Sequence, residues 1–443
     1  MDLNTRMQNV AVVGAAGKMG SGISLLLALE LAYRSLEDPK ATFVLSLIDM
    51  NDSGLQGLLR YVRDQARKDG ERQVNRLRAL YRDRADLVEN AEMVEAFVAE
   101  VMLHLRTGRT LALAKDALLV FEAAFEKEEI KFQIYDELAA LCPPGTWFLT
   151  NTSSIPLHVL THRCGIQGRM IGFHFYNPPA VQKLVELIPP EDCDPALEAG
   201  AEELALVLRK KTVPARDIAG FIGNGHFMRD GLRCIREMER LAPEHGFARA
   251  VHMVEKVSRD WLLRPMGMFQ LIDYVGIDVF QLILRVMEKY LQEGLHSPLV
   301  DTLLEQGVRG GQTSSGAQKD GFLRYEKGRP VGILDPATRD YVPVDAAFAA
   351  DVEARLGPLP DPSLSWKALS RDPGRERKLR AHFAALKGLD SQGAAMARRH
   401  AADSRDIALD LVRQGVAARA EDVNAVLTLG FFHLYGPVND FLD

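Results

Sequence analysis

The chain has 443 residues, which is too long for one hydrophobic core and predicts two or three domains. Hydrophobic residues make up 47% of it and charged residues 26%, a balance typical of an ordinary globular protein. The formal net charge of −6 and the lack of a basic tail argue against general binding to nucleic acid. No apolar run approaches the roughly 18 residues needed to cross a bilayer, so we expect no membrane-spanning segment.

The first residues of the chain and its cysteines give an expectation for the cellular location of the protein. Residues 1–7 lack the apolar stretch of a signal peptide. The cysteines have neither metal-type nor redox-type spacing, so we expect no metal centre and free thiols. Free thiols are typical of a reducing compartment, and a cytoplasmic location is the prediction. The four cysteines are Cys142, Cys164, Cys193 and Cys234.

A glycine-rich loop follows the first apolar run. We expect a buried strand at residues 9–13, the loop at 14–22 and a helix from about 18 to 36. Glycines let a backbone turn sharply and lie against a pyrophosphate at a helix N-terminus, so this order predicts a dinucleotide site. The G-x-x-G-x-x-G spacing differs by one residue from the usual G-x-G-x-x-G, and a tight turn without a ligand is the alternative. The candidate cofactor contacts are Gly14, Ala16, Gly17, Lys18, Met19 and Gly20.

The next expected strand, residues 43–48, ends in Asp49. A carboxylate at this point accepts hydrogen bonds from the adenosine ribose hydroxyls and repels a 2′-phosphate. Asp49 lies 29 residues beyond Gly20, later than the usual interval of about 20, and a long helix and loop account for the excess. No arginine follows Asp49 to hold a 2′-phosphate, so NAD is the predicted cofactor.

The most informative segment is residues 170–188, which places a histidine and a glutamate twelve positions apart. His174 ends one apolar, strand-like run, Glu186 lies inside a second, and two prolines lie in the turn between them. The two runs can therefore return side by side and bring the two side chains together. A histidine oriented by a carboxylate is a general base near neutral pH. From spacing alone, a strand histidine beside an ordinary surface glutamate is an equal alternative.

The same residues carry a resemblance to a known family. Residues 172–179 read Gly-Phe-His-Phe-Tyr-Asn-Pro-Pro and residues 183–188 read Lys-Leu-Val-Glu-Leu-Ile. This resembles the signature of the 3-hydroxyacyl-CoA dehydrogenases, where a His-Phe-Phe-Asn-Pro-like run precedes a Lys-Leu-Val-Glu-like run. The resemblance extends, with gaps, from about residue 9 to the C-terminus. It implies that His174 is the base, that Glu186 orients it and that Asn177 supports the nicotinamide end of the cofactor.

Two further segments extend the resemblance within the nucleotide-binding half. Residues 122–131 are similar to the family's Glu-Ala-x-x-Glu segment, which implies that Glu126 and Lys131 line the cofactor. A charged helix N-terminus is the alternative. Residues 151–154 look like the family's Asn-Thr-Ser-Ser turn, which implies that Ser153 reaches the substrate carbonyl and the cofactor. Without that context the run is a common polar turn.

A junction near residue 220 resembles the family's Asp-x-Pro-Gly-Phe-x-x-Asn-Arg run. It implies that Asn224 faces the active site. Ala219 stands where that run has proline and Gly225 where it has arginine. The departures put the local rigidity and one packing anchor in doubt.

A basic segment lies in this otherwise acidic chain. Nine basic residues and four acids occur from residue 60 to residue 84, with apolar positions at roughly helical spacing. The pattern predicts an exposed helical arm over about residues 55–115, and the resemblance implies that such an arm holds the phosphates of CoA. A solvated helix face is an equal alternative. The nine are Arg60, Arg63, Arg67, Lys68, Arg72, Arg76, Arg78, Arg82 and Arg84.

After residue 213 the pattern changes to long helical stretches. Residues 265–278 and 319–325 resemble marker segments of the family's helical C-terminal domain. A Pro/Gly-rich passage at 327–362 is predicted to be a linker with one short helix. Beyond it, residues 406–431 have the pattern of a second, diverged copy of the helical domain.

The predicted fold is α/β: a Rossmann-type doubly wound sheet domain over residues 1–213, followed by all-α C-terminal domains over 214–330 and 345–443. The resemblance implies an NAD-dependent oxidoreductase of fatty acid metabolism (β-oxidation) that reversibly oxidises the 3-hydroxyl of an acyl-CoA to a ketone. Two alternatives stay open: a dehydrogenase of a free hydroxy acid or sugar acid, and a non-catalytic NAD-binding scaffold. We expect an acyl-CoA substrate, no nucleic acid or membrane partner, and a monomer or homodimer. The implied catalytic residues are His174, Glu186, Ser153 and Asn224.

Overall fold

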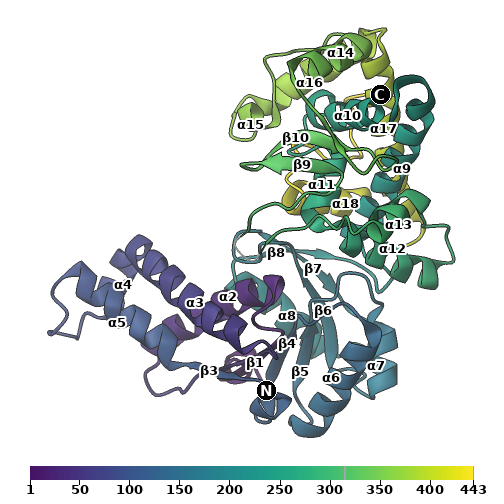
Figure 1. Cartoon of the computed structure of the whole chain (residues 1–443). Coiled ribbons are helices and arrows are strands. Elements are labelled where there is room, and N and C mark those ends of the chain that lie inside the picture. Colours follow the sequence, from purple (N-terminus) through teal and green to yellow (C-terminus); the bar gives the residue numbers. More distant parts are fainter. Residues whose placement is uncertain (314–315, 443) are drawn as a thin grey trace. The chain divides into compact units, whose positions relative to one another are not determined.

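The computed structural model describes residues 1–313 and 316–442 (Figure 1). The chain forms two compact units, residues 1–218 and residues 219–443. Each unit has its own cluster of buried apolar side chains. Among the described residues, no helix has the length and apolar character needed to span a membrane.

An eight-stranded sheet forms the centre of the first unit, in the order β3-β2-β1-β4-β5-β6-β7-β8. Neighbouring strands are parallel throughout except β6 and β7, which pair antiparallel. The predicted doubly wound sheet is therefore confirmed. Its strands are β1 (Asn9–Val13), β2 (Val44–Ile48), β3 (Leu105–Gly108), β4 (Leu119–Glu122), β5 (Trp147–Thr150), β6 (Met170–Phe175), β7 (Leu184–Ile188) and β8 (Lys211–Pro214).

Helices cover both faces of this sheet, because successive strand residues point to opposite sides. Leu149 packs in the cluster that includes side chains of α2 (Lys18–Glu37) and α8 (Pro195–Val207). Its neighbour Phe148 instead meets Tyr135 of α6 (Glu128–Leu141), with ring centroids 5.8 Å apart. Strands buried on both faces explain the near-continuous apolar runs in the sequence. The remaining helices near the sheet are α1 (Leu3–Arg6), η1 (Leu111–Ala114) and α7 (Leu157–Cys164).

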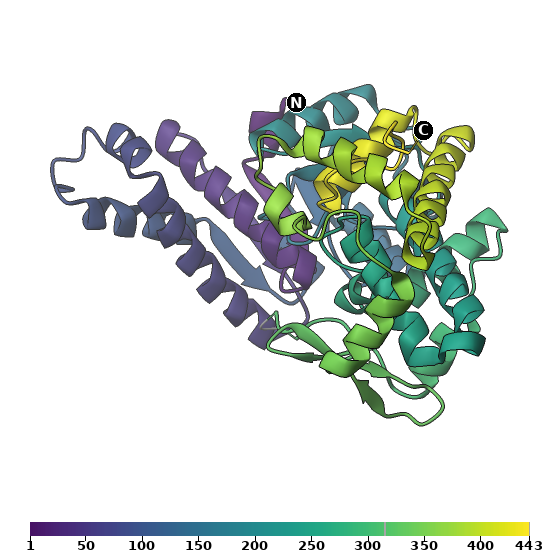
Figure 2. The ribbon, with the colours of Figure 1, turned by 90° about the horizontal axis from the view of Figure 1, so that it is seen from above.

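Three helices between β2 and β3 form the predicted arm, which extends away from the sheet (Figures 1 and 2). They are α3 (Asp52–Arg72), α4 (Val74–Leu80) and α5 (Asn90–Leu103). Val62 of α3 and Phe97 of α5 are fully buried in the apolar cluster of the unit. The arm is therefore anchored by its apolar stripe, and its polar face is left to solvent.

The second unit is mainly helical, and one large apolar cluster joins its first and last parts. Phe280 and Met238 from its first part share this cluster with Phe383 and Ala397 from its last part. The predicted helical segments 214–330 and 345–443 thus meet in one core, and the origin of the second as a diverged copy stays a prediction. The helices are α9 (Gly223–His245), α10 (Phe247–Lys256), η2 (Val257–Trp261), α11 (Met268–Val275), α12 (Ile277–Leu291), α13 (Pro298–Glu305), α14 (Ala346–Leu356), α15 (Trp366–Leu369), α16 (Arg375–Gly388), α17 (Gln392–Arg413) and α18 (Ala420–Gly430).

The passage predicted to be a linker contains a small sheet, so the linker prediction and the all-helical description were incomplete. Strands β9 (Leu323–Glu326), β10 (Arg329–Leu334) and β11 (Tyr341–Pro343) pair antiparallel, and the expected short helix, α14, follows them. Pro330 and Gly332 are typical of loops, yet they flank a register shift in β10. An irregularity of this kind tolerates proline in a strand.

Candidate active site

The candidate residues of the first unit lie at the carboxyl edge of its sheet, where the strand order reverses. From β1 the sheet continues to β2 on one side and to β4 on the other. In folds of this kind the loops that leave two such strands diverge, and ligands bind in the crevice between them. Gly14 follows β1, Asp49 follows β2, Asn151 follows β5 and His174 lies near the end of β6.

The glycine loop is tightly packed against the loop after β4. Gly14 has φ +77°, and a Cβ atom there would lie 2.6 Å from the carbonyl oxygen of Ala123. A Cβ atom on Gly20 would lie 1.9 Å from the carbonyl oxygen of Gly14. Glycine is therefore required at both positions, and the backbone stays accessible at the N-terminus of α2, which Gly17 caps. N–H groups in a first helical turn have no acceptor within the helix, so this loop fits the pyrophosphate of NAD.

Asp49 is held at the edge of the glycine loop. Its Oδ2 accepts a hydrogen bond from the Ala16 N–H at 3.0 Å, and its Oδ1 accepts one from the Asn51 N–H at 2.9 Å. These two donors orient the carboxylate beyond the end of β2. The Ala16 amide, a sequence candidate for a phosphate contact, is thus engaged by Asp49. The arrangement fits the ribose of NAD.

A buried charge network underlies the loop after β4. Lys131 is 1% exposed and contacts Glu122 Oε1 at 2.7 Å and Glu126 Oε2 at 3.3 Å. Burial lowers the pKa of Lys131, but the two carboxylates outweigh burial and raise it, so the ammonium stays charged. Glu122, which the sequence did not single out, also accepts the Thr150 hydroxyl at 2.7 Å and that of Tyr135 at 3.1 Å. The network joins β4, β5 and α6.

Glu126 shapes the Asn-Thr-Ser-Ser turn. Its Oε1 accepts the N–H of Ser153 at 2.8 Å, the N–H of Ser154 at 3.1 Å and the hydroxyl of Thr152 at 2.6 Å. Burial raises the pKa of Glu126, yet Lys131 and these donors outweigh it and lower the pKa, so the carboxylate is ionised. Glu126 therefore positions Ser153. The buried Lys131 ammonium contributes to this indirectly, because it holds the Glu126 carboxylate in place. Direct contact of either residue with the cofactor stays a prediction.

His174 and Glu186 lie directly opposite each other on β6 and β7, as the spacing predicted. His174 Nδ1 is 3.0 Å from Glu186 Oε1. The histidine is 7% exposed and the glutamate 0% exposed. A hydrogen on Nδ1 donates to the carboxylate, which leaves Nε2 as the basic nitrogen. The two side chains therefore lie within hydrogen-bonding distance, and their role in catalysis stays a prediction.

Tyr176 is a site residue that the sequence analysis missed. Its hydroxyl donates to the same oxygen, Glu186 Oε1, at 2.6 Å. Burial, and then the charge of Glu186, raise the pKa of Tyr176 well above its usual value, so the phenol stays protonated. The available signal was position, because residues 174 and 176 fall on one side of an extended chain. The family signature quoted above has phenylalanine at this place.

Two polar residues tie neighbouring segments together near the end of β6. Asn151 Oδ1 accepts the Phe175 N–H at 2.9 Å, which ties the serine turn to the strand that carries His174. Asp217 Oδ2 accepts the His158 N–H at 2.7 Å and so caps the first turn of α7. Asn177 follows directly after this end of the strand and is half-buried. Asn151 thus joins the serine turn to β6, and Asp217 joins the first turn of α7 to the segment after β8.

Asn224 lies in the first turn of α9, in the second unit, and is half-buried. At Gly225 a Cβ atom would lie 2.9 Å from Leu411 Cδ2. Arg229, one turn later, donates from its guanidinium to the Gly225 carbonyl at 2.7 Å and pairs with Glu293 at 2.6 Å. Leu411 and Arg229 therefore supply packing where the family signature has arginine. The role of Asn224 in catalysis stays a prediction.

Most basic residues of the arm have local acidic partners. The ion pairs are Arg67–Glu95, Arg72–Asp69, Arg76–Glu37, Arg82–Asp83 and Arg84–Asp86. Arg60, Arg63 and Lys68 are exposed on α3 and form no ion pair with any residue that the structure describes. These three are therefore available to an anionic group.

Comparison with known proteins gives the family. The model of the 3-hydroxyacyl-CoA dehydrogenase NAD-binding domain matches residues 9–218, and that of the C-terminal domain matches residues 220–325. The 3-hydroxybutyryl-CoA dehydrogenase of Mycobacterium tuberculosis is 31% identical over 325 residues, which is 73% of this chain and 100% of that protein. The chain belongs to the 3-hydroxyacyl-CoA dehydrogenase family. It is an NAD-dependent oxidoreductase.

Two solved structures agree with this membership. The crystal structure of FadB2 from Mycobacterium tuberculosis has 31% identity and a TM-score of 0.55, and the match covers 72% of this chain and 99% of that one. The 3-hydroxybutyryl-CoA dehydrogenase of Escherichia coli has 23% identity and a TM-score of 0.64 over 98% of this chain and 90% of its own. The second likeness shows that the fold is shared beyond residue 325, where the family models end.

Replacing Tyr176 by Phe should lower the kcat of this dehydrogenase by about tenfold. The change removes one of the two donors to Glu186 Oε1, so the carboxylate beside His174 is held less firmly. A hydrogen bond to a charged group is worth about 1.5 kcal/mol or more, which corresponds to about tenfold in rate. Steady-state kinetics of both proteins with an acyl-CoA substrate measure the effect. Tyr81→Phe, a buried phenol in the arm, is the matched control, and wild-type kcat in Tyr176→Phe would contradict a role for this hydrogen bond.

Asp49→Ala should narrow the preference for NADH over NADPH. The carboxylate repels the 2′-phosphate of NADPH, and we expect its loss to tighten NADPH binding by about tenfold while NADH binding weakens. Quenching of protein fluorescence gives both dissociation constants. Asp52→Ala, an exposed acid in the next turn of chain, should leave the ratio unchanged. Equal affinity of the unmodified protein for both cofactors would contradict a contact between Asp49 and the adenosine ribose.

Proposed function

We propose that this protein reversibly oxidises the 3-hydroxyl of an acyl-CoA to a ketone with NAD, using His174 as base and Glu186 as its orienting partner. The observation that supports this best is the 3.0 Å contact between His174 Nδ1 and the fully buried Glu186. This pairing suits a general base, because the carboxylate orients the ring and stabilises its charged form. The position of His174 at the carboxyl edge of the sheet, tied to the serine turn through Asn151, adds to the support.

In the proposed reaction His174 Nε2 removes the proton of the 3-hydroxyl. Bound NAD would supply the acceptor for the hydride that leaves C3, the carbon that bears this hydroxyl. Glu186 stabilises the imidazolium that forms, and it does so strongly because attraction between charges is greater in a buried, low-dielectric site than in water. In the reverse direction His174 returns the proton to the ketone oxygen.

The other candidates position the reactants in this proposal. Ser153 donates its hydroxyl to the substrate oxygen, and Glu126 holds the turn that presents it. Asn224 contacts the substrate, and Asn177 supports the nicotinamide end of the cofactor. The glycine loop holds the pyrophosphate and Asp49 the adenosine ribose.

The acyl-CoA substrate is supported by the names of the relatives and by the arm. The M. tuberculosis relative is named a 3-hydroxybutyryl-CoA dehydrogenase. On α3, three exposed cations that have no acidic partner among the described residues suit the phosphates of CoA. We further propose a role in fatty acid β-oxidation. We also propose a cytoplasmic location, which the four free thiols support.

The deciding experiment compares acetoacetyl-CoA with free acetoacetate as substrates, with NADH oxidation as the readout. We expect turnover of the thioester and little of the free acid. Faster turnover of the free acid would favour a hydroxy-acid dehydrogenase. NADH binding without turnover over a panel of acyl-CoA chain lengths would favour a non-catalytic scaffold.

Replacing Glu186 by Gln should leave the fold intact and lower kcat by about 10²-fold or more, because the imidazolium loses its counter-charge. Steady-state kinetics with acetoacetyl-CoA and NADH measure the effect, and circular dichroism checks the fold. Glu191→Gln, an exposed acid just after β7, is the control. Wild-type turnover in folded Glu186→Gln protein would refute the proposed catalytic pair.

The double change Arg60→Gln and Arg63→Gln should raise the KM for acetoacetyl-CoA by about tenfold with little change in kcat, because it removes ground-state contacts with phosphate. The KM for acetoacetyl-pantetheine, which lacks the nucleotide phosphates, should not change. Arg82→Gln, whose guanidinium is already paired with Asp83, is the control. Equal effects on both substrates would argue against phosphate binding by α3.

We also propose that the protein is a monomer, because α17 packs on α9 within one chain. Arg233 contacts Asp403 at 2.7 Å and the His226 ring contacts the Ser404 carbonyl at 3.1 Å. An intramolecular partner is present at high effective concentration and competes with a second chain. Sedimentation velocity at micromolar concentration should give one species with the 49.2 kDa mass of a single chain. A dimer that persists on dilution would contradict this.

A further inference from the structure

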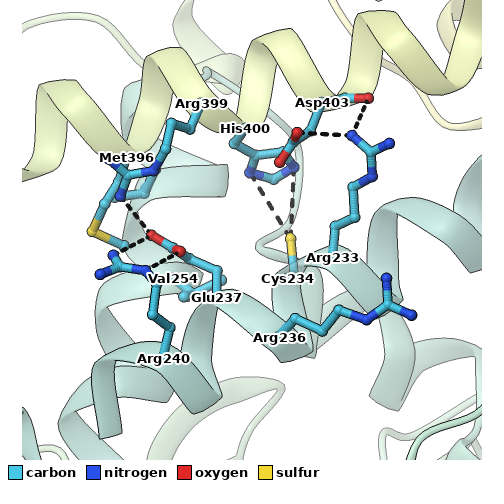
Figure 3. A pocket seen from close by; sticks show the side chains of 11 residues that line it. Arg233, Cys234, Arg236, Glu237, Arg240, Val254, Met396, Arg399, His400 and Asp403 are labelled. Carbon is cyan, nitrogen blue, oxygen red and sulfur yellow. Dashed lines mark hydrogen bonds and ion pairs between the residues drawn. The ribbon is translucent and has the colours of Figure 1, made fainter.

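The helical unit contains a pocket that the proposed dehydrogenase reaction does not use. Its cavity volume is about 330 Å³, and it lies among α9, α10 and α17 (Figure 3). Its first lining residue, Arg233, lies nine residues after Asn224 on α9. That spacing corresponds to roughly 14 Å along the helix axis. The lining residues are Arg233, Cys234, Arg236, Glu237, Arg240, Val254, Val257, Met396, Arg399, His400 and Asp403.

The charged groups of the pocket are mostly positive, in a chain whose net charge is −6. Arg240 and Arg399 both donate to Glu237, at 2.8 Å and 2.7 Å. Arg233 donates to Asp403 at 2.7 Å. Three guanidinium groups therefore share two carboxylates, as Figure 3 shows. All five side chains are between 25% and 57% exposed, and ion pairs so exposed are weak and exchange readily.

The fourth arginine leaves a positive charge without a counter-charge. Arg236 forms no ion pair with any residue in the described part of the chain, and it is exposed. With four guanidinium groups against two carboxylates, the lining carries an excess of two positive charges. An incoming anion can thus pair with Arg236 and share the guanidinium groups that now contact Glu237.

The floor of the pocket is neutral and partly apolar. Val254, Val257 and Met396 line it together with Cys234, whose Sγ lies 3.6 Å from His400 Nε2. Burial, and then the charge of Asp230, raise the pKa of the Cys234 thiol well above its usual value, so it does not repel an anion. A ligand that suits this site has an anionic end at the rim and an apolar end on the floor.

A metal ion is the rival occupant, because ligand atoms of Asp230, Cys234 and His400 lie within 4.8 Å of one another. However, Arg264 donates to Asp230 at 2.8 Å and lies 3.1 Å from His400 Nε2. A guanidinium at this place repels a cation and occupies its carboxylate ligand. The charges therefore favour an anion over a cation.

We propose that this pocket binds a small phosphate monoester with an apolar group. A phosphate dianion has the charge and the several acceptor oxygens to contact guanidinium groups from both α9 and α17. The volume is that of a site for a small metabolite, since such pockets hold roughly 300–1,000 Å³. The bound ligand joins α9 to α17 and so stabilises the helical unit.

The test is a calorimetric titration of the full chain with phenyl phosphate, in saturating NAD so that the glycine loop is filled. We expect binding of phenyl phosphate, weaker binding of inorganic phosphate and none of phenol. Arg236→Gln and Arg399→Gln should each weaken the binding of phenyl phosphate by about tenfold. Arg371→Gln, an exposed arginine of the same unit outside the pocket, should leave it unchanged.

Thermal unfolding gives a second measurement of the same site. Phenyl phosphate should raise the unfolding temperature of the wild type and of Arg371→Gln, and raise it less in Arg236→Gln and Arg399→Gln. Wild-type affinity in both pocket variants, or no binding at all, would overturn the proposal. So would stoichiometric binding of zinc chloride that is lost in Cys234→Ser, because it would identify a cation site.

Discussion

The proposed chemistry depends on keeping one carboxylate charged with none of its surface exposed. Glu186 is fully buried, and an ion in that position is tolerated only where donors surround it. His174 and Tyr176 supply two such donors to a single oxygen. The antiparallel pairing of β6 and β7 makes this possible, because a short turn returns the chain with the two residues opposite each other. A parallel neighbour would need a long crossover and could not place Glu186 twelve residues after His174.

A second buried charge network supports the same edge of the sheet. Glu122 and Glu126 share the ammonium of Lys131, and hydrogen bonds satisfy their other oxygens. Through Glu126 this network sets the position of Ser153. It does so without any side chain of the network having to contact His174. The two networks meet through Asn151, which follows Thr150 of the first and bonds to the strand of the second. Loss of either one is therefore expected to disturb the other, since side chains in one hydrogen-bonded frame do not act independently.

Local patterns explain which of these features the sequence predicted. The glycine loop, Asp49 and the His174 to Glu186 spacing are each set by a strand end or a short turn, so they leave a signal within about 20 residues. Tyr176 was missed because an aromatic residue in an apolar strand suggests core packing and not a donor to a buried acid. The strand β10 was missed because Pro330 suggests a loop, and only its pairing with β9 and β11 shows otherwise.

The helical unit contains a feature that local sequence patterns could not predict. Asp230, Arg264 and His400 are far apart in the sequence, yet they form a buried polar cluster where α9 meets α17. Burial raises the pKa of Asp230, but Arg264 and then His400 outweigh it and hold the pKa well below its usual value, so the pair stays ionic. Replacing a buried ion pair of this kind with apolar residues is often neutral or stabilising, so stability alone does not account for it. Its geometry favours one alignment of α17 on α9, because α17 shifted by one turn would take His400 away from Asp230 and Ser404 away from Arg264. The alignment that satisfies these charges is also the one that brings Arg399 of α17 beside Glu237 of α9 at the rim of the pocket.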